Sequence, residues 1–242
     1  ARPLGQARQV NAVEAVNGVP APPLVCIDPP YYDNVPYADL SDFFYVWLRR
    51  ALRDTYPDLF RPLLTPKEEE LIADPYRQGG PDAARRHFEE GMRRVFRNLR
   101  ARAHPDYPLT LYYAFKQQEV EEDEEGETEA VASTGWETFL QGLVEGGFQV
   151  VATWPMRTER SNRPRGLGSN ALASSIVLVC RPRPEGAPRA SRQEFLRALR
   201  AELPKALEDL TRGSIPPVDL AQSAIGPGMA VFSRYSAVVE PD

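Results

Sequence analysis

The stretch that decides the fold is "LVCIDPPYYDNVPY", residues 24–37. It begins as a short apolar run, which is typical of a strand buried on both faces, and then turns sharply into an acid, two prolines and two tyrosines. Ligands of open α/β sheets bind in the crevice outside the carboxyl ends of the strands. Asp28 follows such an end, so the sequence predicts a binding site there.

The residues after this strand favour a particular kind of ligand. Pro29 and Pro30 fix the backbone and remove two N–H donors, which leaves carbonyl oxygens beside the Asp28 carboxylate. Such a rigid corner of acceptors suits a group that only donates, such as the exocyclic amine of a nucleobase. Tyr31 would offer the base a face to stack on, and base–aromatic stacking contributes roughly 1 to 3 kcal/mol. Stacking and the two hydrogen bonds to the amine are together about the size needed to offset the few kcal/mol that flipping a base out of a duplex costs.

Composition restricts the class of protein. Apolar residues make up 42% and charged residues 26% of 242 residues, and no apolar run approaches the roughly 20 residues of a membrane-spanning helix. The first residues lack the apolar stretch of a secretory signal. Cys26 and Cys180 both lie in apolar runs and are not closely spaced, so they predict buried free thiols in a reducing cytoplasm rather than a disulfide or a zinc site.

The net charge of −5 hides an uneven distribution. The stretch "EVEEDEEGETE", residues 119–129, holds eight acids and no basic residue, so the rest of the chain carries +3. Such an acidic run is typical of a solvated loop. The charge of the remainder is therefore compatible with binding to nucleic acid.

Apolar runs and helical periodicity alternate along the chain, which predicts an α/β fold, an open sheet with helices on its faces. The expected strands are residues 24–27, 109–115, 148–154 and 174–180, and the expected helices are residues 40–56, 81–103, 135–147 and 192–212. We expect the aromatic residues Phe43, Phe44, Tyr45 and Trp47 to pack as core, and Asp39 or Ser41 to cap the helix from residue 42 onward.

The domain organisation follows from a change of composition after residue 185. Residues 1–185 form the main, catalytic part, and residues 186–242 form a helical C-terminal extension that packs on it. The end of this extension, "IPPVDLAQSAIGPGMAVFSRY" (215–235), is a tail punctuated by proline, in which "GPGMA" (226–230) is expected to be a loop.

The motif "DPPY" after an apolar strand resembles the catalytic motif of the DNA amino-methyltransferases, which move a methyl group from S-adenosylmethionine to an exocyclic base nitrogen. Longer blocks are similar to the large adenine-specific DNA methylases described as containing a zinc ribbon. These blocks are "DPPYYDNVPYADLSDFFYVWLRR" (28–50), "STGWETFLQGL" (133–143), "TWPMRTERSNR" (153–163), "SNALASSIVLVCRPR" (169–183) and "PVDLAQSAIGPGMAVFSRY" (217–235). The resemblance covers nearly the whole chain and implies a Rossmann-like methyltransferase sheet.

The chain departs from the family in two respects. It has no Phe-x-Gly-x-Gly loop after a first strand, which binds the methyl donor in this class, and it has no zinc-ribbon cysteines. "GLGSN" (166–170) and "GPGMA" are not placed between a strand and a helix, so neither replaces that loop. The family carries these parts upstream of the catalytic motif, which implies that this chain is the C-terminal half of a longer protein or one subunit of a split enzyme, with an incomplete sheet.

The resemblance also implies roles for individual residues. Asp28 would orient and polarise the target amine, Pro29 would offer its carbonyl oxygen, Pro30 would stiffen the corner and Tyr31 would stack on the base. Asn11, within "RQVNAVEAV" (8–16), lies where the family places an Asp or Asn near the adenine of the donor, and the alternative is an ordinary turn asparagine. Asp28 would also face the donor.

Further residues are candidates for contact with DNA. The segment "MRTERSNRPR" (156–165) lies between two strands and carries Arg157, Arg160 and Arg163, whose guanidinium groups suit phosphates, and Asn162, which suits a base edge. The alternative for this segment is a solvated hairpin loop. Tyr32 would extend the base pocket, or else only shape the start of the next helix.

The sequence therefore predicts an S-adenosylmethionine-dependent DNA adenine methyltransferase, without a metal and with DNA as partner, whose role could be restriction-modification, phage defence or housekeeping. Its donor-binding glycine loop would come from an upstream domain or a second chain. Two alternatives stay open. One is a non-catalytic nucleic-acid-binding or assembly module that lacks donor binding, and the other is methylation of the cytosine amine.

Overall fold

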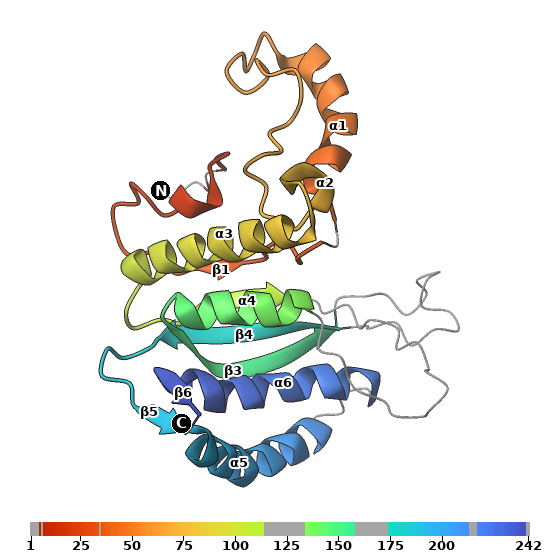
Figure 1. Cartoon of the computed structure of the whole chain (residues 1–242). Helices are drawn as coiled ribbons and strands as arrows, with labels where there is room; N and C mark the ends of the chain where they lie inside the picture. Colours follow the sequence, from red (N-terminus) through yellow and green to blue (C-terminus); the bar gives the residue numbers. More distant parts are fainter. Residues whose placement is uncertain are drawn as a thin grey trace, which may run out of the picture.

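The structure is a computed structural model that describes residues 5, 7–33, 35–113, 134–157, 174–212 and 217–240. A sheet and a layer of helices form the body of the chain, and an arm, residues 37–74, stands away from them (Figure 1). Asn11, Asp28 and Tyr31 lie in the described part, whereas Arg160, Asn162 and Arg163 lie outside it.

Strands and helices alternate as the sequence predicts. The strands are β1 (Cys26–Ile27), β2 (Leu109–Tyr113), β3 (Phe148–Arg157), β4 (Ser174–Pro182), β5 (Arg189–Ser191) and β6 (Ala237–Val239). The helices are the short 3₁₀ turn η1 (Ala12–Glu14) and α1 (Tyr37–Leu52), α2 (Pro75–Gln78), α3 (Pro81–Arg102), α4 (Thr134–Glu145), α5 (Arg192–Arg212) and α6 (Pro217–Ser233). The α/β class is confirmed.

The main sheet has four strands in the order β1-β2-β4-β3. β1 is parallel to β2, while β4 is antiparallel to both of its neighbours, β2 and β3. β3 therefore runs in the same direction as β1 and β2, so the carboxyl ends of these three strands lie at one end of the sheet. β5 and β6 form a separate parallel pair.

One face of the sheet carries the hydrophobic core. Burial alternates along β2, where Leu109, Leu111 and Tyr113 are buried and the residues between them are partly exposed. These side chains pack in one cluster with α3 and α4, in which Phe96 contacts the rings of Phe139 and Phe148. The helix predicted for residues 81–103 is confirmed, and it contributes Phe88, Met92 and Leu99 to this core.

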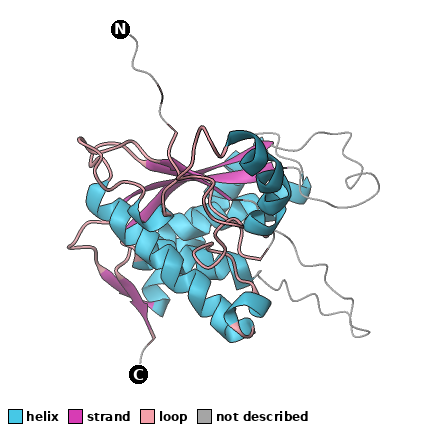
Figure 2. Ribbon diagram, turned by 90° about the horizontal axis from the view of Figure 1, so that it is seen from above, coloured by secondary structure: helices cyan, strands magenta, loops and turns pink. Residues whose placement is uncertain are grey.

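The other face of the sheet bears exposed apolar side chains. By strand alternation and register, Leu24, Cys26 and Trp154 share this face; Leu24 is 66% exposed and Trp154 is 63% exposed. The helices of the body lie together on the opposite side of the sheet (Figure 2). The expected sheet flanked by helices is confirmed, with the described helices of the body on one side of it, and Cys26 is exposed rather than buried.

The C-terminal extension is more regular than its prolines suggest. α6 runs through "GPGMA" as a helix, so the expected loop is wrong. Pro217 stands at the first position of α6, where its missing N–H is not needed. Gly226 allows α6 to approach β3, because a Cβ atom there would lie 2.1 Å from Oγ1 of Thr153. The Val150 N–H also donates to Oγ of Ser233 at 2.8 Å, so the extension packs on the main part as predicted.

In the arm, one side of α1 packs on the returning segment 53–74. Tyr45 contacts the ring of Phe60 at 5.6 Å between centroids and donates its hydroxyl hydrogen to the Pro62 carbonyl. Asp42 accepts from the hydroxyl and backbone N–H of Thr65 and pairs with Lys67. These contacts hold the segment antiparallel to the helix.

Two expectations for α1 are wrong. Phe43, Phe44 and Trp47 are 67%, 63% and 59% exposed, because the helix stands out from the body and only its other side is covered. The helix also begins at Tyr37, before the expected caps. A free backbone N–H of its first turn, that of Ala38, donates to Oε1 of Glu70 at 2.9 Å, so the hydrogen bond comes from a residue distant in sequence.

An acid titration tests the Asp42 contacts. Lys67 and Thr65 bind the ionised carboxylate and lower the pKa of Asp42 to about 2. The folded-state pKa of Asp42 lies below its ordinary pKa. The stabilisation by the ionised carboxylate is therefore fully present at any pH above the ordinary pKa, and it is lost as the pH falls toward 2. We expect Asp42→Asn to speed proteolysis of the arm at neutral pH, and the difference from the unaltered chain, followed with an acid-tolerant protease, to vanish near pH 2. A difference that persisted there would contradict this role.

Candidate functional site

The candidate site is the corner that follows β1, built by residues 28–31. Asp28 is exposed, and Pro29 and Pro30 are partly exposed, so the carboxylate is directed away from the interior. No described residue donates to the Pro29 carbonyl oxygen. The corner thus presents oxygen acceptors at the carboxyl end of a parallel strand, as the sequence predicts.

Tyr31 joins this corner to the next strand. Its hydroxyl donates to Oδ1 of Asp28 at 2.5 Å, which leaves the second carboxylate oxygen free for a ligand. Its ring lies tilted on that of Tyr113, the last residue of β2, with centroids 5.0 Å apart. Partial burial and the neighbouring Asp28 carboxylate raise the pKa of Tyr31, so the hydroxyl stays a donor at every physiological pH.

Tyr32 holds the turn in place. It has a φ of 55°, a left-handed conformation that is unfavourable for a bulky residue. Its carbonyl accepts from the Ala73 N–H at 3.0 Å and its ring meets the edge of Phe88 at 5.2 Å, so the protein interior compensates for the strain. Tyr32 therefore anchors the corner, and its predicted contact with nucleic acid stays a prediction.

The turn at Tyr32 requires a glycine in α4. A Cβ atom on Gly135 would lie 2.6 Å from Cβ of Tyr32, well inside van der Waals contact. We expect Gly135→Ala to lower the free energy of unfolding by about 1 to 3 kcal/mol, the usual cost of overpacking. Denaturant unfolding measures this.

Gly142 in the same helix is the matched control for this substitution. The nearest atom to a Cβ atom there would be Cβ of Met92 at 3.7 Å, which is ordinary contact. Alanine is favoured over glycine inside a helix by about 0.5 to 1 kcal/mol, so Gly142→Ala should be neutral or stabilising. Equal losses at the two positions would show that the contact with Tyr32 is not the cause.

Asn11 lies outside this corner in the described contacts. Its side-chain oxygen accepts from the Val13 N–H at 2.9 Å and so caps η1. Its amide donates to Oε2 of Glu69 at 3.0 Å, which ties the N-terminal segment to the arm. These contacts give Asn11 a structural role, and its predicted place near a methyl donor stays a prediction.

Arg157 ends β3, at the same end of the sheet as Asp28 but on the opposite edge strand. The segment that carries the other candidates for DNA contact, Arg160, Asn162 and Arg163, lies outside the described residues, as does "GLGSN".

Tyr113 and Gly135 belong to the site but are not among the residues that the sequence singles out. Tyr113 is buried, lies under Tyr31, and continues into the core through Trp136 and Phe139 at 4.8 and 4.5 Å. The sequence could have indicated Tyr113, because it ends the strand parallel to β1, and the carboxyl ends of neighbouring parallel strands lie together. The sequence could not have indicated Gly135, since Tyr32, which it contacts in the fold, is distant in sequence.

Comparisons with protein-family models, curated proteins and solved structures found no match for this chain. Within the described residues there is no group of three or more His, Cys, Asp or Glu that could hold a metal ion. No described helix is both long and apolar enough to cross a membrane.

Proposed function

We propose that the chain is the target-base half of an S-adenosylmethionine-dependent DNA methyltransferase that acts on the exocyclic amine of adenine. The observation that carries this proposal is the exposed Asp28 carboxylate beside the Pro29 carbonyl, at the carboxyl end of β1 and within reach of the Tyr31 ring. The "DPPY" resemblance gives this corner its chemical meaning.

The corner can activate an amine by hydrogen bonding alone. The free oxygen of Asp28 and the carbonyl of Pro29 can each accept one hydrogen of the amine, which draws the nitrogen lone pair out of conjugation with the ring. Tyr31 donates to the other oxygen of Asp28 and so fixes the orientation of the carboxylate. Most of the reduction of the barrier then comes from positioning.

When bound, S-adenosylmethionine would supply the methyl group and would leave as the neutral thioether. The amine nitrogen would gain positive charge as it is methylated, and its proton would pass to solvent water along the hydrogen bond to Asp28. Asp28 stabilises the developing charge through its hydrogen bond, and no base with a shifted pKa is needed. Stacking of the extruded base requires that the Tyr31 ring present the face that Tyr113 does not cover.

The described residues fit the acceptor side of this reaction, and the sheet indicates where the donor side belongs. β1 is an edge strand, and Leu24 and Cys26 are exposed on the sheet face that carries them. An open strand edge next to an uncovered apolar face is unfavourable for a free-standing sheet. We propose that a donor-binding segment, in the same longer chain or in a second chain, completes a Rossmann-like sheet at β1.

Calorimetry with S-adenosylmethionine tests the proposal on this chain alone and on a form that includes the sheet-completing segment. We expect binding to the longer form, followed by transfer of a labelled methyl group to duplex DNA. Nucleoside analysis of the product separates adenine from cytosine methylation. Absence of donor binding in both forms would favour the non-catalytic alternative.

A further inference from the structure

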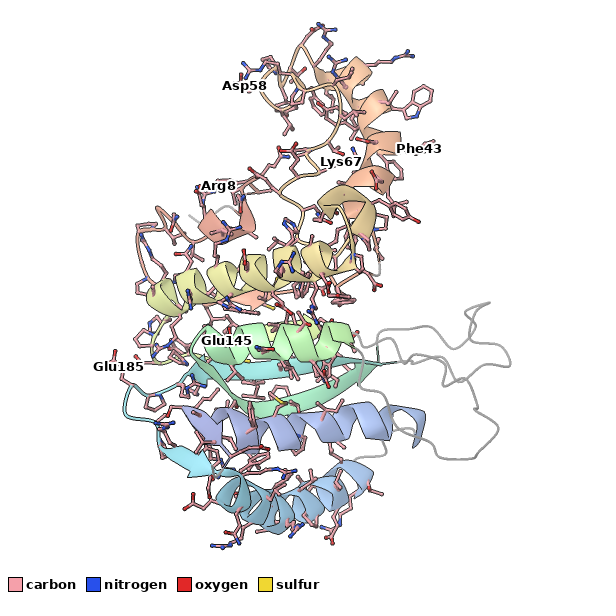
Figure 3. All side chains as sticks on the ribbon, in the orientation of Figure 1. Arg8, Phe43, Asp58, Lys67, Glu145 and Glu185 are labelled. Atoms are coloured by element: carbon pink, nitrogen blue, oxygen red, sulfur yellow. The ribbon has the colours of Figure 1, made fainter. Side chains whose placement is uncertain are left out.

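The arm presents an apolar face that the described chain does not cover. We call it the outer face of α1, and it consists of Leu40, Phe43, Phe44, Trp47 and Leu48, which are 47% to 67% exposed. Spacings of three and four residues place these side chains on one side of the helix. Phe43 lies on the side of α1 opposite to Lys67, which belongs to the returning segment (Figure 3).

The outer face is the more apolar side of α1. Ala38, Tyr45 and Arg49 mark the inner side; Ala38 is buried, and the other two contact Phe60 or its carbonyl. An apolar stripe on a helix is typically buried against a partner. The segment 53–74 is the first partner, so the outer face indicates a second.

The charges of the arm are distributed unequally between its two ends. Near the start of α1 the arm carries six acids, Asp39, Asp42, Glu68, Glu69, Glu70 and Asp74, against one base, Lys67. Arg77 of the neighbouring α2 pairs with Asp39, Glu70 and Asp74. At the far end, where Asp58 lies (Figure 3), the reverse holds: Arg49, Arg50, Arg53 and Arg61 against Asp54 and Asp58. An arm that is acidic at one end and basic at the other is complementary to an antiparallel copy of itself.

The edge of the outer face carries the same complementarity. Asp39 and Arg50 are eleven residues apart, about three helical turns, so both flank the outer face on the same edge. Arg50 is exposed and forms no ion pair within the described structure, and the Asp39 side chain stays 49% exposed beside Arg77. In an antiparallel helix pair, same-edge residues meet, which brings Asp39 opposite Arg50 of the second copy.

We infer that the outer face of α1 binds a second copy of this chain, with the two α1 helices antiparallel around a twofold axis near Phe44. The arrangement is isologous and closed, so it stops at a dimer. Large aromatic side chains offer roughly 150–250 Å² each, so the exposed parts of Phe43, Phe44 and Trp47 supply roughly 280–470 Å² of the about 800 Å² per partner of a standard interface, and Leu40 and Leu48 add to this. The macrodipoles of the antiparallel helices also attract each other. This inference does not rest on the proposed enzymatic function.

Sedimentation velocity of the full chain over a range of concentrations tests the inference. We expect a monomer–dimer equilibrium, and we expect Trp47→Glu to raise the dimer dissociation constant by at least about 30-fold, as for a central interface tryptophan. Since Trp47 is 59% exposed in the single chain, the substitution should leave the circular dichroism and melting of the monomer unchanged. Arg50→Glu should raise the dissociation constant less than Trp47→Glu does. Added salt should reduce this effect of Arg50→Glu, because salt screens the pairing with Asp39.

Tyr76→Glu is the matched control, because Tyr76 is 98% exposed but lies on α2. It should leave the dimer intact. A chain that stays monomeric at the highest concentrations, or a dimer that Trp47→Glu does not weaken, would overturn the inference. Loss of duplex binding in Trp47→Glu without any change of oligomeric state would instead assign the face to nucleic acid, and would equally overturn it.

Discussion

Replacing Asp28 by alanine is expected to reduce methyl transfer by about 100-fold or more in the enzyme that includes the sheet-completing segment. Loss of a single group that stabilises charge in an active site commonly has an effect of this size on kcat. Because Asp28 is exposed and is bonded only by Tyr31 in the described structure, its removal should leave the fold and the affinity for DNA nearly unchanged. Transfer of labelled methyl groups and a parallel DNA-binding titration measure the two quantities.

Asp54→Ala provides the comparison for this substitution, since it removes another exposed carboxylate, 99% exposed, at the far end of the arm. It should retain full transfer. If Asp28→Ala retained the activity of this control, the carboxylate would not be the group that binds the amine. If both variants lost activity together with DNA binding, a general effect of charge would be responsible.

Replacing Phe96 by alanine is expected to lower the free energy of unfolding by about 3 to 5 kcal/mol. Phe96 is fully buried on α3 and its ring contacts Phe139 and Phe148, so truncation leaves a cavity between α3, α4 and the sheet. Gly146 approaches the same side chain so closely that a Cβ atom there would lie 2.4 Å from Cβ of Phe96, which limits how far the helices can collapse. Urea unfolding followed by circular dichroism measures the loss.

Tyr76→Ala is the comparison for the core, because its ring is almost entirely in solvent and surface substitutions usually change stability by less than about 0.5 kcal/mol. A loss of less than about 1 kcal/mol for Phe96→Ala would mean that the core repacks, and would contradict the rigid arrangement of α3 and α4 described above.

The sequence was sufficient to predict the four strands of the main sheet, the helices α1, α3, α4 and α5, and the exposed corner at Asp28. Short apolar runs identify strands such as β2 and β4 because buried strands need apolar side chains on successive residues. The stripe on α3 identifies its buried side for the same reason. The acceptor character of the corner follows from the covalent structure of proline, which is independent of the rest of the fold.

Other features depend on contacts between residues that are far apart in sequence. An apolar run carries no strand direction, so the antiparallel orientation of β4 could not be read from residues 174–180. The helix through "GPGMA" forms despite its glycines because Gly226 fits against Thr153. Periodicity also predicted an apolar side for α1. It contains no information on which segment covers that side, and in the structure Phe43 and Trp47 are exposed.

The pairing of β1 has a consequence for the order of folding. β3 and β4 are near neighbours along the chain, whereas Cys26 of β1 must find Thr110 of β2 across α1, α2 and α3. Closing the longer loop costs more entropy, and β1 is only two residues long and hydrogen-bonded on a single edge. The strand that carries Asp28 should therefore be the last to become ordered and the first to open in the native state, with its amide hydrogens among the fastest in the sheet to exchange with solvent.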